Sequence, residues 1–574
     1  SDLLLTKSIL FRQCQDTLQL VKKLCWDLLR CIIVQLHFLF DSIVDLAFGI
    51  YYDKKAKKVP PVKNKLLLES AVSLAEKIRT KEATSEEIVG AYIERCKEVN
   101  GLINAIVETR YSDAIEEAKA VDAMIEKCAD LEKMKITQPF LGVPFTTKDS
   151  NRVKGMSVAA WKWSTFLVQG LIHSLGLPCR RNHRAKEDAT AVRFLKEAGG
   201  ILIATTNVPE LNLWCESRNN LYGQTNNPYN ITRTVGGSSG GEAAILSASG
   251  SPLSVSSDIG GSIRMPAFFN GLFGHKPSEG LTPMAGIGLR EKDYVDTIAA
   301  VGPLCRKAED LIPFMKVLVG PNVTKLKLDE PVNVKNLKVF YQESSGDLRT
   351  SSINGTMRAT LKKAVQHFKE LTGSATKIKI PGSEYGYKLW RYCMSCEDIN
   401  FKLNITDRKV RIKFKFKALQ HCPELRGNKI YYVASASGEI YNLLTGNSQL
   451  TLAAIMKLID EDILPRENAE WAKSATAKAK QFLAEKLGDN GVLFYPSAPF
   501  PANYHYSAYL RPFNFSYWCL LNALRFPTCQ VPLGLDEQGL PVGIQVVAAP
   551  YNDHICIAVA KELETAFGGW VPPS

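Results

Sequence analysis

The chain has 574 residues, 45% of them hydrophobic and 22% charged, which supplies a large core and excludes a disordered chain. Its formal net charge is +13, but arginines do not alternate with aromatic residues along it, so nucleic acid is not an expected partner. Its 14 cysteines are scattered, and a disulfide-built secreted scaffold is not expected at this size.

An apolar stretch from Cys31 to Tyr52 is the first predicted element. It exceeds the roughly 20 residues that a membrane helix needs, yet Asp41 and Asp45 lie inside it. A charged residue at the bilayer centre costs about 2.5–3.5 kcal/mol on insertion scales. The two aspartates would share one helical face, and lysines flank the stretch. The pattern fits a helix in the membrane interface at least as well as one that crosses the bilayer. A helix packed on the protein's own surface is the alternative.

The residues after this helix suggest how the chain is divided. "DKKAKK" at 53–58 is typical of a solvated linker, and it would also favour an anionic membrane face. We expect an amino-terminal segment over 1–58. A linker over 59–68 follows, where "VPPVKNK" begins with paired prolines.

Two amphipathic helices are predicted beyond the linker. Thr84 and Glu87 have the spacing of a capping box, and Asn100-Gly101 supplies a stop, so the first helix covers 84–101. The second covers 112–128, with the sequence "SDAIEEAKAVDAMIEKC".

Buried strands are expected at 140–149 and 199–210, where apolar runs end in polar residues. A helix over 188–200 lies between them and stops at glycines. This alternation predicts an α/β domain whose sheet is at least partly parallel. Such sheets place chemistry at strand ends, and Lys148 stands at one of them.

Two dense clusters of glycine and serine follow, "VGGSSGGEAA" at 235–244 and "SSDIGGSIRMPA" at 256–267. Neither closes with the Gly-Lys-Ser/Thr of a P-loop, and "GGSSGG" lacks the spacing of a dinucleotide fingerprint. The favoured interpretation is a nucleophile beside an oxyanion hole. Ser262 follows two glycines whose backbone can bend tightly and direct N–H groups at one oxygen.

A serine nucleophile needs a base, and no histidine lies nearby in the sequence; His275 in "GHKPS" is interpreted as structural. A lysine that burial keeps neutral can act as the base, and Lys148 is the candidate, with Ser238 as a proton relay. The C-x-x-C at 393–396 has no second pair, which favours a helix with half-buried thiols over a zinc or redox site.

These clusters carry a resemblance to a known family. "GGSSGGEAA…SSDIGGSIRMPAFFNGLFGHKP" is similar to the signature of the amidase signature family, and "GVPFTTKD" resembles the family's lysine segment. The resemblance extends from about residue 69 to 570. In detail it points to the fatty-acid amide hydrolases, especially the type-2 branch and its insect-like relatives.

The resemblance implies one large α/β/α domain over 69–574, with a twisted mixed sheet covered by helices on both faces. It implies a Ser-Ser-Lys triad, with Ser262 as nucleophile, Ser238 as the bridging serine after a cis peptide, and Lys148 as base. Further residues are assigned by motif position: oxyanion-hole amides at Ile259, Gly260, Gly261 and Ser262, a substrate contact at Asn212, and supporting hydrogen bonds from Ser239 and Ser257.

The implied activity is hydrolysis of lipid amides through an acyl-enzyme, without metal or organic cofactor. The expected partners are a lipid amide and an intracellular membrane surface, such as an endomembrane or lipid droplet, and a homodimer is possible. Two alternatives remain at this point: an amidase or amidotransferase-type subunit that acts on another amide, and an inactive amidase-like binding protein.

Two stretches depart from the family pattern, at 161–175 and 408–438. The first is an apolar insertion between Lys148 and Ser238, which would form a lipid-facing lid or disturb the rim of the site. The second contains "RIKFKFK", which alternates like an exposed strand where the family implies helix and loop. A second interpretation of both stretches is that they are translated intron sequence or errors in the gene model.

Overall fold

A mixed sheet of 11 strands forms the centre of the computed structural model, which describes residues 2–128, 130–154, 170–294, 296–397, 399, 401, 405 and 435–573. The strand order is β1-β3-β2-β6-β8-β7-β12-β13-β11-β9-β10. The strands are β1 (Ile106–Thr109), β2 (Pro144–Lys148), β3 (Ile201–Thr206), β6 (Leu253–Asp258), β7 (Phe273–Lys276), β8 (Ala300–Cys305), β9 (Lys338–Tyr341), β10 (Ala375–Lys377), β11 (Gly491–Pro496), β12 (Thr528–Leu535) and β13 (Pro541–Ala548). A separate two-stranded sheet joins β4 (Arg218–Asn219) to β5 (Gly223–Gln224).

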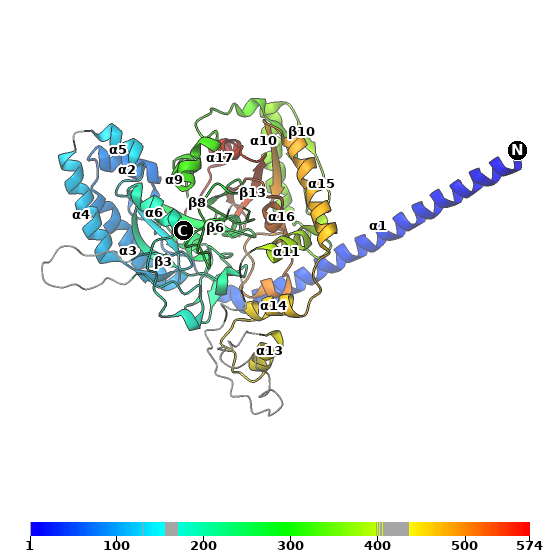
Figure 1. Cartoon of the computed structure of the whole chain (residues 1–574), viewed down its shortest axis with the longest axis horizontal. Helices are drawn as coiled ribbons and strands as arrows, with labels where there is room; N and C mark the ends of the chain where they lie inside the picture. The colour runs from blue at the N-terminus through cyan, green and yellow to red at the C-terminus, as the bar shows by residue number, and fades with distance from the viewer. Residues whose placement is uncertain are drawn as a thin grey trace, which may run out of the picture.

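Helices surround this sheet (Figure 1). They are α1 (Asp2–Tyr52), α2 (Ala71–Arg79), α3 (Ser85–Ile103), α4 (Tyr111–Lys127), α5 (Leu131–Thr137), α6 (Thr190–Glu197), α7 (Gly240–Ser247), α8 (Arg264–Phe269), α9 (Leu311–Val319), α10 (Gly355–Thr372), α11 (Gly386–Cys396), α13 (Ala436–Leu444), α14 (Leu452–Asp462), α15 (Ala469–Leu487), α16 (Ser516–Leu524) and α17 (Asp553–Phe567).

The sheet separates two apolar cores, because successive side chains of a strand point to opposite faces. On β11, Val492 and Phe494 join the core that holds residues of α10 and α17, whereas Leu493 and Tyr495 join the core beneath α15 and α16. Helices therefore cover both faces, and the predicted α/β/α domain with a mixed sheet is confirmed. β2 runs parallel to both β3 and β6, while β8 pairs antiparallel with β6.

The predicted helices and strands around the sheet are present, but several ends differ: β2 begins at Pro144 instead of 140, β3 ends at Thr206 instead of 210, and α3 runs past its expected end. Thr84 caps α3, its side chain accepting the N–H of Glu87. The expected stop at Asn100 is wrong, because α3 continues to Ile103 and ends at Asn104, which adopts a left-handed φ of 47°. The Asn100 side chain instead accepts the N–H groups of the two residues after that turn, at 2.8 and 2.9 Å.

Helix α1 leaves the rest of the molecule at an angle, with the amino terminus at its far end (Figure 1). Its second half lies against the domain from Arg30 onward, where Arg30, Val34 and His37 line a cavity together with residues 343–353. Val44 is buried, and Phe48 and Tyr52 stack near Tyr504. Residues 27–55 are long and apolar enough to cross a membrane.

The residues expected as a linker lie against the domain. The N–H of Val59 donates to the carbonyl of Pro228 at 3.1 Å, and both Val59 and Leu67 are buried. The division of the chain at 58 and 68 stays a prediction. Of the two atypical stretches, 161–169 and 408–434 lie outside the described residues. Residues 170–175 are mostly buried, and residues 436–438 begin α13.

Two further sequence interpretations agree with the structure. His275 is fully buried on β7, and its Nε2 lies 2.9 Å from Oδ1 of Asp553. Cys393 and Cys396 lie on α11, the first half-buried and the second exposed. Within the described ranges, no group of three or more His, Cys, Asp or Glu side chains could hold a metal ion.

Candidate active site

Lys148 ends β2, and its ammonium nitrogen is enclosed by serines from two other segments. Nζ lies 2.9 Å from Oγ of Ser238 and 3.2 Å from Oγ of Ser257. Ser257 comes near the end of β6, which is parallel to β2, so the two strands deliver both side chains to the same edge of the sheet. Lys148 and Ser238 thus meet across 90 residues of sequence.

Burial tunes the charge of this lysine. Lys148 is fully buried, and desolvation lowers its pKa to about 7, against the opposing effect of Glu242 and Asp258. Asp258 is already paired with Arg264, whose Nε lies 3.0 Å from Oδ2. Burial also raises the pKa of Glu242 to about 7, and its carboxyl group accepts hydrogen bonds from Thr146 and Thr206. A large share of Lys148 is therefore neutral near pH 7.

The first Gly/Ser cluster holds Ser238 in a crowded turn. The Gly237–Ser238 peptide bond is cis, as the family resemblance implies. A Cβ on Gly237 would stand 2.1 Å from the carbonyl oxygen of Trp214, so no larger residue fits there. Ser217 braces the turn, since its Oγ accepts the N–H of Gly240 and donates to the carbonyl of Gly236, both at 3.0 Å.

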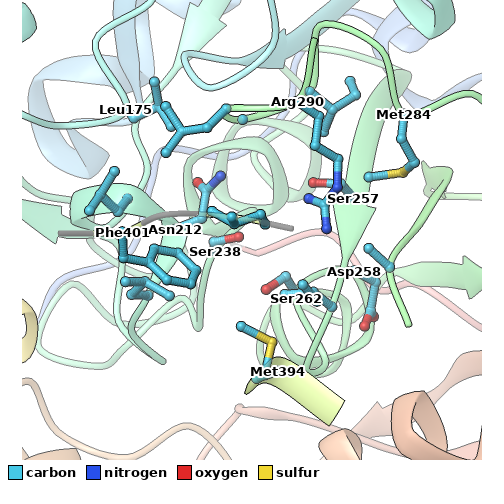
Figure 2. Close-up of a pocket in the computed structure, with 18 residues that line it drawn as sticks. Leu175, Asn212, Ser238, Ser257, Asp258, Ser262, Met284, Arg290, Met394 and Phe401 are labelled. Atoms are coloured by element: carbon cyan, nitrogen blue, oxygen red, sulfur yellow. The ribbon is translucent and has the colours of Figure 1, made fainter. Parts of the chain in front are cut away.

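The second cluster places Ser262 in the same cavity as Ser238 (Figure 2). Ser262 retains 8% exposure, and its carbonyl accepts the backbone N–H of Ser239 at 3.2 Å. Gly261 has a φ of 111°, and a Cβ there would approach Cβ of Trp518 to 2.4 Å. Glycine is therefore required just before the predicted nucleophile, for both its conformation and its size.

The loop before Ser262 offers backbone donors, with one exception. The N–H of Gly261 donates to Oδ1 of Asp258 at 2.7 Å, so it fastens the loop instead of pointing into the cavity. Among the described residues, no hydrogen bond uses the N–H of Ile259, Gly260 or Ser262. In the described part of the chain, three of the four predicted oxyanion amides are thus without a partner, and Gly261 holds the turn.

The predicted supporting residues differ in how they act. Ser257 contacts Lys148 through its hydroxyl, as expected. The hydroxyl of Ser239 is buried and has no partner among the described residues, and only its backbone N–H reaches Ser262. Asn212 lines the cavity, with a left-handed φ of 61° and a buried Oδ1 that has no partner in the described part of the chain (Figure 2).

The rest of the cavity wall is mainly apolar. It includes Leu175, the last residue of the apolar stretch 161–175. It also includes residues that sequence reasoning did not identify: Leu211, Leu213, Met284, Ile287, Leu289, Met394, Ile399 and Phe401. Arg290 also lines it, and its guanidinium donates to Glu397 at 2.7 Å. No local motif marks these residues, because they reach the cavity from segments far apart in sequence. The cavity combines serine hydroxyls and free amides with a wall suited to an apolar group.

This geometry can perform acyl transfer. A neutral Lys148 can accept a proton from Ser238 at 2.9 Å. The described residues show no hydrogen bond between the hydroxyls of Ser238 and Ser262, which share the cavity, so transfer from Ser262 to Ser238 requires these two side chains to approach. The unoccupied amides beside Ser262 can stabilise an oxyanion. None of these steps uses a group other than the chain's own side chains and backbone.

The sequence matches the Amidase family over residues 87–162 and 164–557. Fatty-acid amide hydrolase 2 of Homo sapiens is 40% identical over 544 residues, which covers 94% of this chain and 96% of that protein. Fatty-acid amide hydrolase 2-A of Danio rerio is 39% identical and covers 90% and 92%. A solved structure named "Fatty acid amide hydrolase" has a TM-score of 0.66 at 19% identity, covering 89% of this chain and 86% of that one. The structural likeness shows a shared fold.

Proposed function

Since the chain belongs to the amidase signature family and is an amidase that hydrolyses amide bonds, we propose that it cleaves lipid amides with Ser262, Ser238 and Lys148 as its triad. The observation that carries this proposal is the contact of 2.9 Å between Lys148 and Ser238, which lines the same cavity as Ser262. Burial gives this lysine the lowered pKa that a neutral base requires.

We infer the following reaction for this triad. Lys148 draws a proton from Ser262 through Ser238, and Oγ of Ser262 attacks the amide carbonyl. Amides of Ile259, Gly260 and Ser262 stabilise the oxyanion. The proton then returns through Ser238 to the leaving nitrogen, the C–N bond breaks, and the amine departs. Water, deprotonated along the same path, hydrolyses the acyl-enzyme and releases the carboxylic acid.

The cavity wall supports a lipid as substrate. Its apolar side chains, among them Leu213, Met284, Met394 and Phe401, suit an alkyl chain better than a polar acyl group. The free Oδ1 of Asn212 can accept a hydrogen bond from the N–H of the substrate amide. The names of the relatives, fatty-acid amide hydrolase 2, agree with this substrate class.

We expect full-length enzyme to release fatty acid and amine in equal amounts from a long-chain N-acyl amide. Each methylene buried in the cavity is worth about 0.8 kcal/mol, so kcat/KM should rise about fourfold per methylene until the cavity is filled. Mass spectrometry of both products across an acyl series measures this. Faster turnover of acetyl than of long-chain amides would contradict the lipid substrate while leaving amide hydrolysis intact.

The proposed membrane contact rests on the two faces of α1. One face meets the domain, where Arg511 pairs with Asp41 and Asp45 at 2.8 Å each. The opposite face is an exposed apolar stripe at helical spacing, formed by Leu28, Ile32, Leu36, Leu39, Ile43, Leu46 and Ile50. Since both carboxylates face the domain and share the Arg511 guanidinium, the helix can lie along a membrane with only the stripe in lipid.

A triple substitution in this stripe tests the membrane contact. Leu39→Glu, Ile43→Glu and Leu46→Glu together should move most of the protein from the membrane pellet to the supernatant, because each buried leucine or isoleucine contributes about 1.5–3 kcal/mol. Hydrolysis of a short soluble amide should not change, while hydrolysis of long-chain amides in vesicles should fall. Substitutions are preferred to deletion of residues 1–58, which would also remove the partners of Arg511.

The matched control is Leu443→Glu with Leu444→Glu, two exposed leucines on α13. It should leave the membrane fraction unchanged. If the triple variant stays in the pellet, the stripe does not bind lipid. Suppose that the wild type is a dimer in detergent and the triple variant is a monomer, while both still bind vesicles. The stripe then binds a second copy, and the membrane proposal is wrong.

A further inference from the structure

The indole of Trp390 lies on the loop that precedes Ser262. Its Nε1–H donates to the carbonyl of Ile259 at 2.7 Å. Its ring also covers Gly260, where a Cβ would stand 3.2 Å from the nearest ring atoms. Trp390 lies on α11, one turn before Met394, which lines the cavity. The same helix therefore forms part of the cavity wall and holds the loop of backbone donors.

The hydrogen bond from Trp390 fixes the direction of the next amide. In a trans peptide, the carbonyl and the following N–H point to opposite sides. The carbonyl of Ile259 points at Trp390, so the N–H of Gly260 points away from it. Trp390 is not among the residues that line the cavity, whereas Ile259 is. We propose that Trp390 is a positioning residue that turns the Gly260 amide toward the oxyanion formed at Ser262.

Two contacts support a fixed position for the indole and its loop. Phe515 meets the Trp390 ring edge-on, with centroids 5.0 Å apart and planes at 83°. On the next peptide, Asp258 accepts the N–H of Gly261 at 2.7 Å. The Ile259–Gly260 peptide is therefore held at its oxygen by Trp390, and its neighbour at its nitrogen by Asp258. An oxyanion hole works because its donors are oriented before the reaction begins.

This inference rests on the proposed function, because it assumes that Gly260 helps to stabilise the oxyanion. Trp390→Phe keeps an aromatic ring over Gly260 and removes only the N–H donor. We expect kcat for a short soluble amide to fall about tenfold, less than the 10²–10³-fold typical of losing a hole donor outright, because the Gly260 amide remains but is less well oriented. KM should change less than twofold.

Three further readouts separate positioning from a merely structural role. The Ki of a trifluoromethyl ketone, which forms an oxyanion on the serine, should rise by the same factor as kcat/KM falls. The apparent pKa of the kcat profile should stay at its wild-type value, because Lys148 is untouched. Trp471→Phe, at an exposed ring on α15 that meets Tyr385 edge-on, should behave as wild type.

An unchanged kcat in Trp390→Phe would overturn the inference, as would a change confined to KM or a shift of the apparent pKa. If Trp390→Phe does not fold, replacing this tryptophan with its benzothiophene isostere removes the same N–H at constant shape, and the same outcomes apply. Ser262→Ala, measured in parallel, distinguishes a failure of the proposed function from a failure of the inference about Trp390. Covalent labelling that persists in Ser262→Ala contradicts the proposed function, whereas lost labelling with a normal Trp390→Phe contradicts only the role of Trp390.

Discussion

Ser262→Ala should abolish covalent labelling by a fluorophosphonate probe, and amide hydrolysis should fall by orders of magnitude. Removal of a serine nucleophile in other hydrolases costs about 10⁶-fold in kcat. The reason here is structural: Ser262 shares the cavity with Ser238, next to the unoccupied amides of Ile259 and Gly260. Gel fluorescence of the labelled protein and product release from a short amide measure the two effects.

The control is Ser395→Ala, a serine on α11 whose hydroxyl is satisfied by its own helix. It should label and turn over as wild type. The melting temperature of Ser262→Ala should stay close to wild type, since the substitution removes one partly exposed hydroxyl. Undiminished labelling in folded Ser262→Ala would mean that another residue is the nucleophile, and the Ser-Ser-Lys assignment would fail.

The parts of the site that could be predicted from sequence are those that a local pattern constrains. Lys148 follows an apolar run, so its place at a strand end could be deduced from the run alone. Gly237 and Gly261 are required by contacts with Trp214 and Trp518, and clusters of such glycines are visible in a sequence. The exact end of α3 is not predictable in this way. The Asn100 side chain accepts the N–H of Ala105, which lies beyond the helix, and Gly101 remains helical.

Contacts between distant segments could not be predicted in this way. Arg511 meets Asp41 across 470 residues, and without that contact the two aspartates of α1 appear as unpaired charges in an apolar helix. The contact between Trp390 and Ile259 likewise spans 131 residues. Such pairs are created by how helices pack on the sheet, which local periodicity does not encode.

The charged groups around Lys148 can likewise be predicted only in part from the sequence. The sequence indicated that a lysine could serve as the base if it were buried, but not which acids would surround it. In the structure, Arg264 neutralises Asp258, whereas Glu242 is satisfied by two threonine hydroxyls. Among the described residues, neither carboxyl group forms an ion pair with Lys148, and burial is the largest influence on the pKa of Lys148. This balance is what allows a lysine to accept a proton near neutral pH.

The pH dependence of this balance can be tested with Glu242→Gln. The Glu242 carboxylate favours the charged form of Lys148 and thereby raises its pKa. Because the pKa of Glu242 is itself about 7, this carboxyl group is charged over only part of the acid limb. Its removal should therefore lower the pKa of Lys148 and move the acid limb of kcat to lower pH by a small amount, with kcat above that limb little changed. A shift to higher pH would contradict the electrostatic account of the site, because a neutral amide cannot stabilise the ammonium as a carboxylate does.

Lys148→Ala should lower kcat by about 10²–10⁴-fold, the usual contribution of a general acid–base group. In the wild-type enzyme the rate should rise with pH through about 7, because Lys148 accepts a proton only when neutral. At pH 5, about 1% of a lysine with a pKa of 7 is neutral, so kcat should be about 100-fold below its plateau. Lys148→Ala should lose this acid limb along with its rate. A variant that keeps both the rate and the limb would show that another group takes the proton from Ser262, even though Lys148 lies 2.9 Å from Ser238.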